Sequence, residues 1–333
     1  MRHKRSIVLI IILAAALICF TLISFSLGRY PLSLRDIFMW LSGKNADVNT
    51  DNILMNIRLP RVLAAILVGA CLSCAGTAYQ GIFRNPMVSP DILGATSGAG
   101  FGAAVAIVMS LPPLAVQLFA FVFGIAAVLA SYTISVVVGR KESVTLVLIL
   151  SGMVITSLLG AFVSIIKYTA DPYGKLPEIT YWLMGSLSAI TRRQLFSAIA
   201  PMFVGFTVII AVKWRINVLS YGDEEARALG VNAKRLRAVV IVAATLITAS
   251  AVSVCGQIGW VGLVIPHITR MLVGPDYRKV VPTAILAGGL FLLVVDTVSR
   301  NLLVVEIPLG ILTAVIGAPV FVYLLCRGKR GWL

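Results

Sequence analysis

Charged residues are scarce in this sequence. Only 12% of the 333 residues are Asp, Glu, Lys or Arg, whereas 59% are hydrophobic and the mean hydropathy is +0.99. Ordinary soluble domains carry about 25% charged residues. A water-soluble globular protein is therefore excluded, and we expect the chain to lie in a lipid bilayer.

Motifs for nucleotide or metal chemistry are also missing. The Gly-Lys pairs at 43–44, 174–175 and 328–329 lack both the upstream glycine and the following Ser or Thr of a phosphate-binding loop. The two histidines, His3 and His267, are too few for a His-rich metal site. We expect no catalytic residue, no metal site and no cofactor in this chain, which argues against an intramembrane enzyme.

The five cysteines fall in or beside apolar runs, so the sequence predicts small buried side chains and no disulfide framework. Cys71 and Cys74 have the spacing of a redox motif. They lie in an apolar run without the strand and helix context that such a motif requires, and a redox role is disfavoured.

Continuous apolar runs dominate the chain and predict about ten transmembrane helices. We therefore expect an all-α, polytopic membrane protein that forms one domain over residues 1–333, with the first run retained as an anchor. The predicted spans are 7–27, 62–82, 92–109, 114–138, 144–166, 195–212, 236–255, 258–272, 280–295 and 309–326.

The distribution of charge predicts the orientation. An even number of spans puts both termini on one side, and the net charge is +15. Most Lys and Arg residues fall in the segments on the side of the termini, which favours cytoplasmic termini. The number of basic residues left on the outer side is nevertheless high, and it calls for an explanation.

Several spans carry helix-interrupting or small residues. Gly94, Gly98 and Gly102 form a doubled G-x-x-x-G pattern, which predicts close helix packing. Glycines and prolines recur between 259 and 319, and such residues survive at membrane depth where protein or a water-filled cavity satisfies the backbone. Short, broken helices are expected here, lining a translocation path or packing tightly; both alternatives stay open.

A polar segment at 217–237 separates two spans. Ser220 and Asp223 fit a helix start signal, and Gly230 is placed to end the helix in a left-handed conformation. The sequence predicts a short surface helix that acts either as a solvated connector or as a docking surface for a cytoplasmic partner.

Seven short motifs occur in order along the chain. They are RLPR at 58–61, GTAYQ at 76–80 continuing to RNPM at 84–87 and PDILG at 90–94, WLMGSL at 182–187, GDEEARALG at 222–230, GWVGLVIPHITR at 259–270, Asp296 with Arg300 and EIPLG at 306–310, and GAP at 317–319. With this order and spacing, the chain resembles the permease subunits of ABC importers for iron-siderophores, haem and vitamin B12, the type II importers.

The resemblance implies an importer with several partners. It predicts two permease subunits, identical or paralogous, two ATPase subunits that bind ATP and Mg, an extracytoplasmic binding protein, and a bacterial inner membrane. It implies no nucleic acid. The 217–237 segment would then couple to the ATPase, with the signature Asp223, Glu224, Glu225, Arg227 and Gly230.

The resemblance also implies roles at the two mouths. Arg58, Arg61 and Arg300 match arginines that receive acidic groups of the binding protein, the alternative being that they snorkel or pair with Asp296, which lies one turn from Arg300. Residues matching a cytoplasmic gate are Asn85, Met87, Thr145 and Leu146. The route would run between the third, fifth, eighth and tenth spans.

Iron-siderophore is the expected cargo, with haem or cobalamin as alternatives. An ion-coupled secondary transporter is the competing class. It is disfavoured because acidic residues inside the spans are nearly missing, Asp296 and Glu306 lying near the span ends.

Overall fold

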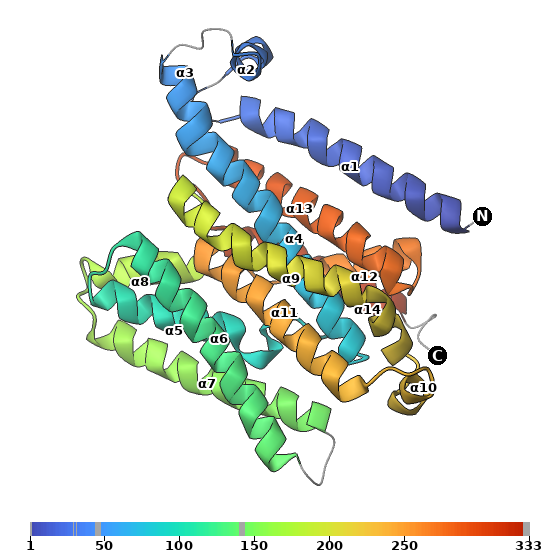
Figure 1. Ribbon diagram of the computed structural model, residues 1–333. Coiled ribbons are helices and arrows are strands. Elements are labelled where there is room, and N and C mark those ends of the chain that lie inside the picture. Colours follow the sequence, from blue (N-terminus) through green and yellow to red (C-terminus); the bar gives the residue numbers. More distant parts are fainter. Residues whose placement is uncertain (1, 29, 31, 44–47, 140–143, 329–333) are drawn as a thin grey trace.

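The computed structural model describes residues 2–28, 30, 32–43, 48–139 and 144–328, and in these ranges the chain forms helices and no strand (Figure 1). The first half contains α1 (Arg2–Ser26), α2 (Leu34–Leu41), α3 (Val48–Asn52), a π-helix η1 (Ile53–Arg58), α4 (Leu59–Ile82), a 3-10 helix η2 (Pro90–Leu93), α5 (Ala95–Val108), α6 (Pro113–Val138) and α7 (Val144–Thr169). The second half contains α8 (Lys175–Met184), α9 (Arg192–Leu219), α10 (Asp223–Ala228), α11 (Ala233–Cys255), α12 (Val261–Val273), α13 (Tyr277–Leu302) and α14 (Leu309–Gly328).

Apolar helices of two lengths make up the bundle. Among the described residues, seven helices are long and apolar enough to cross a membrane. Three more, Ala95–Val108, Val261–Val273 and Leu309–Leu324, are apolar but shorter. The all-helical polytopic membrane fold is therefore as expected, and short helices occur where glycine and proline predicted them. The number of crossings stays a prediction.

Local sequence signals set several helix starts. Thr191 and Gln194 form a capping box at the start of α9, in which each side chain accepts a hydrogen bond from the other residue's backbone N–H. Asn232 and Asp276 cap α11 and α13 by accepting hydrogen bonds from Arg235 N and Arg278 N at 3.0 Å. These caps fix where each helix enters the bundle.

Helix α4 forms the centre of the bundle, and small residues let neighbouring backbones approach it closely. A Cβ added to Gly69 would lie 2.1 Å from the carbonyl oxygen of Gly288 in α13, and one added to Gly76 would lie 1.8 Å from that of Gly262 in α12. Both distances are far inside van der Waals contact. Glycine at these positions is therefore required for the packing of α4 on α12 and α13.

The predicted close packing of the 94–102 segment is confirmed. A Cβ on Gly98 or Gly102 would lie 2.4 Å from the carbonyl oxygen of Phe123 or Phe119 in α6. Gly94 has a different role, because its φ of 87° places it in the left-handed turn before α5. Two of the three glycines thus form the α5/α6 contact and the third forms the turn.

The cysteine prediction is right for three side chains and wrong for two. Cys71, Cys74 and Cys255 are buried free thiols, whereas Cys19 in α1 and Cys326 in α14 are exposed on the surface of the single chain. Cys19 and Cys326 point out of the bundle, because α1 and α14 each bury only part of their surface against the other helices.

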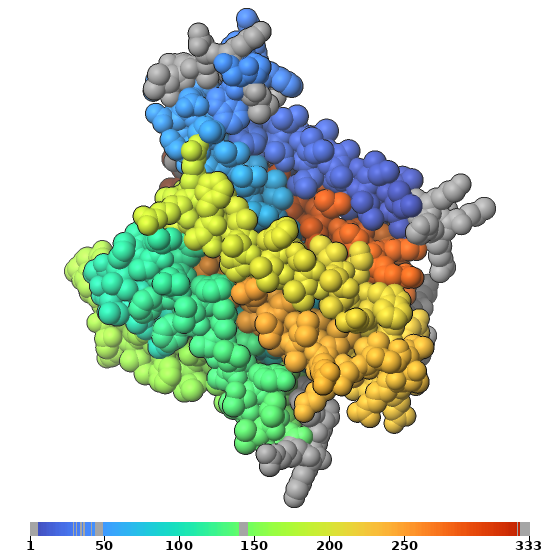
Figure 2. Space-filling view, viewed as in Figure 1, coloured from blue at the N-terminus to red at the C-terminus, as the bar shows by residue number. Residues whose placement is uncertain are grey.

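The bundle has two ends, which carry different short helices. The "α10 end" holds α10, the start of α1 and the close of α14, and the "α2 end" holds α2 and α3 (Figure 1). Helices α4 and α9 run from the α2 end to the α10 end, and α11 and α13 run back. The visible face in Figure 2 has α11 (orange) flanked by α9 (yellow) and α6 (green).

Candidate functional site

Helix α10 lies at the α10 end between α9 and α11 and is about 9 Å long at 1.5 Å per residue. The predicted start at Ser220 is wrong: Gly222 is the N-cap, with φ of 137°, and the Ser220 hydroxyl donates instead to Asn217 O at 2.7 Å. The predicted stop is confirmed, because Gly230 follows the helix with φ of 76°. Glycine at both junctions lets the chain turn sharply into and out of α10.

The coupling residues predicted from the sequence divide into two groups. Glu224, Glu225 and Arg227 are exposed on α10. Asp223 is half-buried and points at α11, where its two oxygens accept hydrogen bonds from Nη1 and Nη2 of Arg237, both at 2.7 Å. This bidentate arrangement is the strong geometry for an Arg–carboxylate pair. It fastens α10 to α11.

Arg237 connects α10 to a third element. Its Nε donates to Ile82 O, the last residue of α4, at 3.4 Å, and Arg84 Nη2 lies 3.9 Å from Asp223 Oδ1. Hydrogen bonding from Arg237 lowers the pKa of the Asp223 carboxyl below its ordinary value, and the charge of Arg84 adds to the effect. Asp223 therefore stays ionised, and the pair joins α10, α11 and the end of α4. The sequence motif contained Asp223 but gave no signal for Arg237.

The predicted gate residues lie at the same end. Asn85 and Met87 are in the loop after α4, where Asn85 Oδ1 accepts a hydrogen bond from Met87 N at 2.9 Å. Met87 and Leu146 are both about half exposed, at 50% and 51%. Thr145 lies in the first turn of α7, and its side chain is outside the described part of the structure.

The two gate segments are adjacent through η2. A Cβ on Gly152 of α7 would lie 2.1 Å from Ile92 O of η2, so the loop after α4 packs directly on α7. The end of α4, η2 and α7 are therefore in contact one after another.

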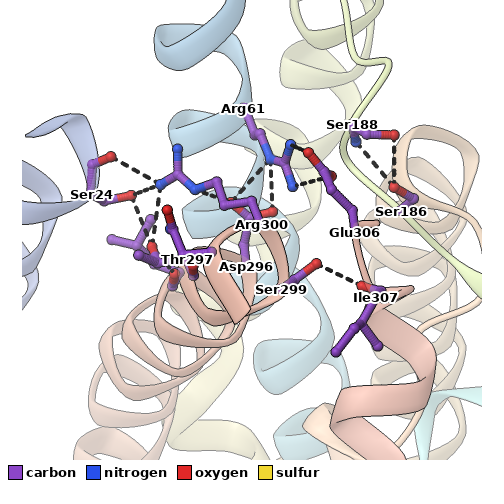
Figure 3. Close-up of polar contacts among 12 residues, drawn as sticks. Ser24, Arg61, Ser186, Ser188, Asp296, Thr297, Ser299, Arg300, Glu306 and Ile307 are labelled. Carbon is purple, nitrogen blue, oxygen red and sulfur yellow. Dashed lines mark hydrogen bonds and ion pairs between the residues drawn. The ribbon is translucent and has the colours of Figure 1, made fainter. Parts of the chain in front are cut away.

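The α2 end holds an ionic network around Arg61 (Figure 3). Arg61 Nε donates to both oxygens of Asp296, at 2.9 and 3.2 Å, and its Nη1 and Nη2 donate to the two oxygens of Glu306, at 3.0 and 2.9 Å. One guanidinium thus binds two carboxylates, from α13 and from the segment before α14. The Asp296 side chain is fully buried and that of Glu306 is 26% exposed.

Arg300 extends the network to α1. Its Nε lies 3.7 Å from Asp296 Oδ2, the pairing that the spacing in α13 predicted. Its Nη2 donates to Ser24 O at 3.0 Å, to the Ser24 hydroxyl and to Thr297 Oγ1 at 3.3 Å. Helices α1, α4 and α13 and the segment before α14 are joined at this end by polar contacts (Figure 3).

Arg58 is bound by backbone carbonyls. It donates to Phe25 O, to Tyr30 O and to Ser26 O, the last at 3.2 Å. The three arginines predicted for the outer mouth, Arg58, Arg61 and Arg300, therefore lie at one end of the bundle, and all three are buried within this chain.

A hollow of about 460 Å³ opens between α8, the start of α12 and α14. Trp260 in its wall has φ of 69°, a conformation that few non-glycine residues adopt. Gln257 donates from Nε2 to Thr96 O at 3.4 Å and so ties this wall to α5. The lining residues are Leu183, Met184, Gln257, Gly259, Trp260, Gly310, Ile311, Ala314 and Val315.

None of the described residues that line this hollow is an acid or a base, so it offers a weakly interacting surface and no catalytic group. Among the described residues, no cluster of three His, Cys, Asp or Glu side chains could hold a metal ion. Polar contacts thus join α10, α11 and the end of α4 at the α10 end, and an ionic network joins α1, α4, α13 and the segment before α14 at the α2 end.

Comparison with known proteins gives matches over nearly the whole chain. The profile of the FecCD transport family matches residues 15–327. The molybdate import system permease protein MolB of Haemophilus influenzae is 39% identical, with 96% of this chain and 95% of the relative covered. A probable iron chelatin transport system permease of Helicobacter pylori is 41% identical, with 83% of each chain covered.

A solved structure agrees with this assignment. A metal-chelate type ABC transporter in an inward-facing conformation superposes with a TM-score of 0.85 and 37% identity, over 96% of this chain and 98% of the other. Fold and sequence therefore lead to the same conclusion. The chain belongs to the FecCD transport family and is a permease subunit of a type II ABC importer, a multi-pass membrane protein that is not itself an enzyme.

Proposed function

We propose that this permease imports a metal chelate, an iron-siderophore complex in the first place and haem or cobalamin as alternatives, across the bacterial inner membrane. The observation that carries the cargo class is the 37% identical transporter of metal-chelate type, which superposes over nearly the full chain. Relatives named for iron chelatin and for hemin support it. A relative is also named for molybdate, so an oxyanion is the competing outcome.

The cargo is tested with the partner that would select it. The extracytoplasmic binding protein is titrated with a ferric siderophore, haem, cobalamin and molybdate, and uptake of the tightest ligand is followed in proteoliposomes that contain the whole complex. Submicromolar binding and ATP-dependent uptake of a metal chelate support the proposal. Exclusive binding of molybdate contradicts it.

The proposed complex contains two permease chains, identical or paralogous, two ATPase subunits and one binding protein. Helix α7 supports the second permease: only 17% of its apolar window is buried in the single chain, which leaves a surface for a partner helix or lipid. The α10 end would face the cytoplasm, where the exposed Glu224, Glu225 and Arg227 contact the ATPase.

In this proposal, the Asp223–Arg237 pair transmits the movement of the ATPase. A force on α10 reaches α11 through the bidentate pair and the end of α4 through the Ile82 carbonyl. Rigid contacts of this kind carry a rigid-body movement from one element to the next. The predicted gate, formed by Asn85, Met87, Thr145 and Leu146, begins three residues after Ile82.

The coupling role is tested at Gly230. Gly230→Ala should keep the subunit folded but lower substrate-stimulated ATP hydrolysis, because an αL alanine costs about 1–2 kcal/mol and shifts the close of α10. Gly43→Ala, at the opposite end of the bundle, is the control: Gly43 has φ of 68° and, like Gly230, has open space around its Cβ position among the described atoms. Glu225→Lys should release the ATPase by charge reversal. Full coupling in both Gly230→Ala and Glu225→Lys would refute the assignment.

The arginines at the α2 end are proposed to receive acidic groups of the binding protein. Their location at the end opposite α10 supports this role. Because Arg58, Arg61 and Arg300 are engaged inside the chain, a docking carboxylate would have to exchange with their present acceptors. Arg58→Gln should weaken docking most at low salt, whereas Arg193→Gln, an exposed arginine at the same end, should not. Equal effects of the two variants would contradict a specific role.

One reconstitution experiment distinguishes an ATP-driven importer from an ion-coupled carrier. Vesicles with this permease and its binding protein, but without the ATPase, should take up no cargo under an imposed proton or sodium gradient. Uptake under these conditions would overturn the importer mechanism proposed here.

A further inference from the structure

A basic pocket of about 390 Å³ lies at the α10 end, between the close of α9 and the start of α11. It borders the coupling segment, because Leu229 and Gly230 at the close of α10 are among its lining residues, and it is separate from the hollow described above. Its polar lining includes Arg215 and Arg235, and none of the described residues that line it is acidic. Apolar residues form the rest of the wall, among them Val212, Leu236 and Val239.

The two arginines are available for a ligand. Both side chains are exposed, and among the described residues neither forms an ion pair. Two positive charges that line one pocket favour an anion as its occupant. Arginine is also the side chain best suited to hold a phosphate bidentately.

Trp214, beside Arg215, indicates the level of this pocket relative to the membrane. It is 51% exposed and lines the pocket. Tryptophan is enriched at the level of lipid headgroups, where its ring can be partly wet. Val212 and Val239 lie about one turn deeper in the same apolar helices as Arg215 and Arg235, so the pocket runs from charged residues toward apolar ones.

A separate apolar groove lies on the other side of α11, and the exposed outer face of α11 connects it to the pocket. This groove, of about 180 Å³, lies between α6 and α11 and is lined by Ile125, Val128, Leu129, Tyr132, Ala238, Ile241, Val242, Thr245 and Leu246. Val242 follows Val239 by one turn, and both are exposed. Figure 2 shows α11 between α9 and α6 on this face.

The length of this surface matches one half of a bilayer. Arg235 and Leu246 are eleven residues apart on α11, which corresponds to about 16 Å along the helix. One leaflet of hydrocarbon is about 15 Å thick. A basic headgroup pocket followed by an apolar groove of this length fits a phospholipid better than a soluble anion, which would leave the groove unused.

We propose that an anionic phospholipid binds here, with its phosphate between Arg215 and Arg235 and one acyl chain along the groove between α6 and α11. The lipid would fill the space between α9 and α11 next to α10 and so stabilise the joint that holds the coupling segment. The inference requires only that the chain spans a membrane, and it goes beyond the transport function proposed above.

The test uses the full-length chain in nanodiscs and phosphatidylglycerol with brominated acyl chains. Bromine quenches a nearby tryptophan, so Trp214 should be quenched by this lipid and not by brominated phosphatidylcholine. The signal should disappear in Trp214→Phe, which separates it from the other four tryptophans. Equal quenching by the two lipids in the wild-type chain would overturn the proposal without the need for any further variant.

Two variants probe the two halves of the site. Arg215→Gln with Arg235→Gln should weaken phosphatidylglycerol binding about 30-fold, since each basic residue near a membrane surface contributes about fivefold and the two factors multiply. Lys234→Gln with Lys279→Gln removes the same charge outside the pocket and should leave binding unchanged. Val242→Phe narrows the groove and should weaken lipid binding with both arginines intact.

Three outcomes would overturn the proposal. The first is an equal loss in the two double variants, which would mean general surface charge. The second is displacement of the lipid by inorganic phosphate together with no effect of Val242→Phe, which would mean a free-anion site. The third is loss of the Trp214 signal when the ATPase is bound, which would mean that the pocket is a protein interface.

Discussion

The buried network at Arg61 gives a sharp test of how charge is held inside this bundle. Asp296→Asn keeps the shape of the side chain but removes the negative charge from a fully buried position. Arg61 then keeps only its pair with Glu306, and Arg300 loses its ion pair with Asp296. Removing one partner of a buried ion pair costs about 3–5 kcal/mol, because the remaining charge is left uncompensated.

Glu306→Gln should cost less. The Glu306 side chain is 26% exposed, so water can replace part of its interaction with Arg61, and the Arg61–Asp296 pair survives. Loss of hydrogen bonds to a charged group lowers the free energy of unfolding by about 1.5–3 kcal/mol. The control at the same end is Glu178→Gln, which breaks the exposed pair with Lys175 at 3.4 Å and should change stability by less than about 1 kcal/mol.

The free energy of unfolding can be measured for all three variants in mixed micelles by titration with a denaturing detergent. The expected order of loss is Asp296→Asn, then Glu306→Gln, then Glu178→Gln. Two results would contradict this reasoning: a smaller loss of unfolding free energy in Asp296→Asn than in Glu306→Gln, or a loss below about 1 kcal/mol in both variants. Either result would mean that burial does not control the energetics of this network.

Two further predictions concern packing and pH. Gly69→Ala should cost at least about 1–3 kcal/mol in the same assay, because its methyl group would lie 2.1 Å from Gly288 O. Gly160→Ala should instead be neutral or stabilising by up to about 1 kcal/mol, because among the described atoms nothing lies within 4 Å of its Cβ position. Because the pKa of Asp223 is lowered in the folded state, its pairing with Arg237 should add stability above the ordinary aspartate pKa of 3.8 and lose it as pH falls below that value. The difference in unfolding free energy between the wild type and Asp223→Asn should therefore shrink on acidification; a constant difference would contradict the ion-pair role.

The sequence predicted local features well where neighbouring residues carry the signal. The glycine after α10 was predicted because a left-handed residue is needed to end that helix, and Gly98 and Gly102 were predicted to allow close packing because they lie one turn apart. The start of α10 was misassigned. Ser220 fits a capping pattern, but its hydroxyl is used at the end of α9, and Gly222 makes the turn instead.

By itself, the sequence determined the environment of this protein, because long apolar runs require a membrane. The ordered motifs predicted the family that the comparisons then showed. Only the tertiary structure decided which charges meet. Arg61 and Glu306 are 245 residues apart, and Arg237 reaches Asp223 and Ile82 from another helix. Such pairings depend on how helices cross, and a periodic pattern along one helix carries no information about the partner that its charged face will contact.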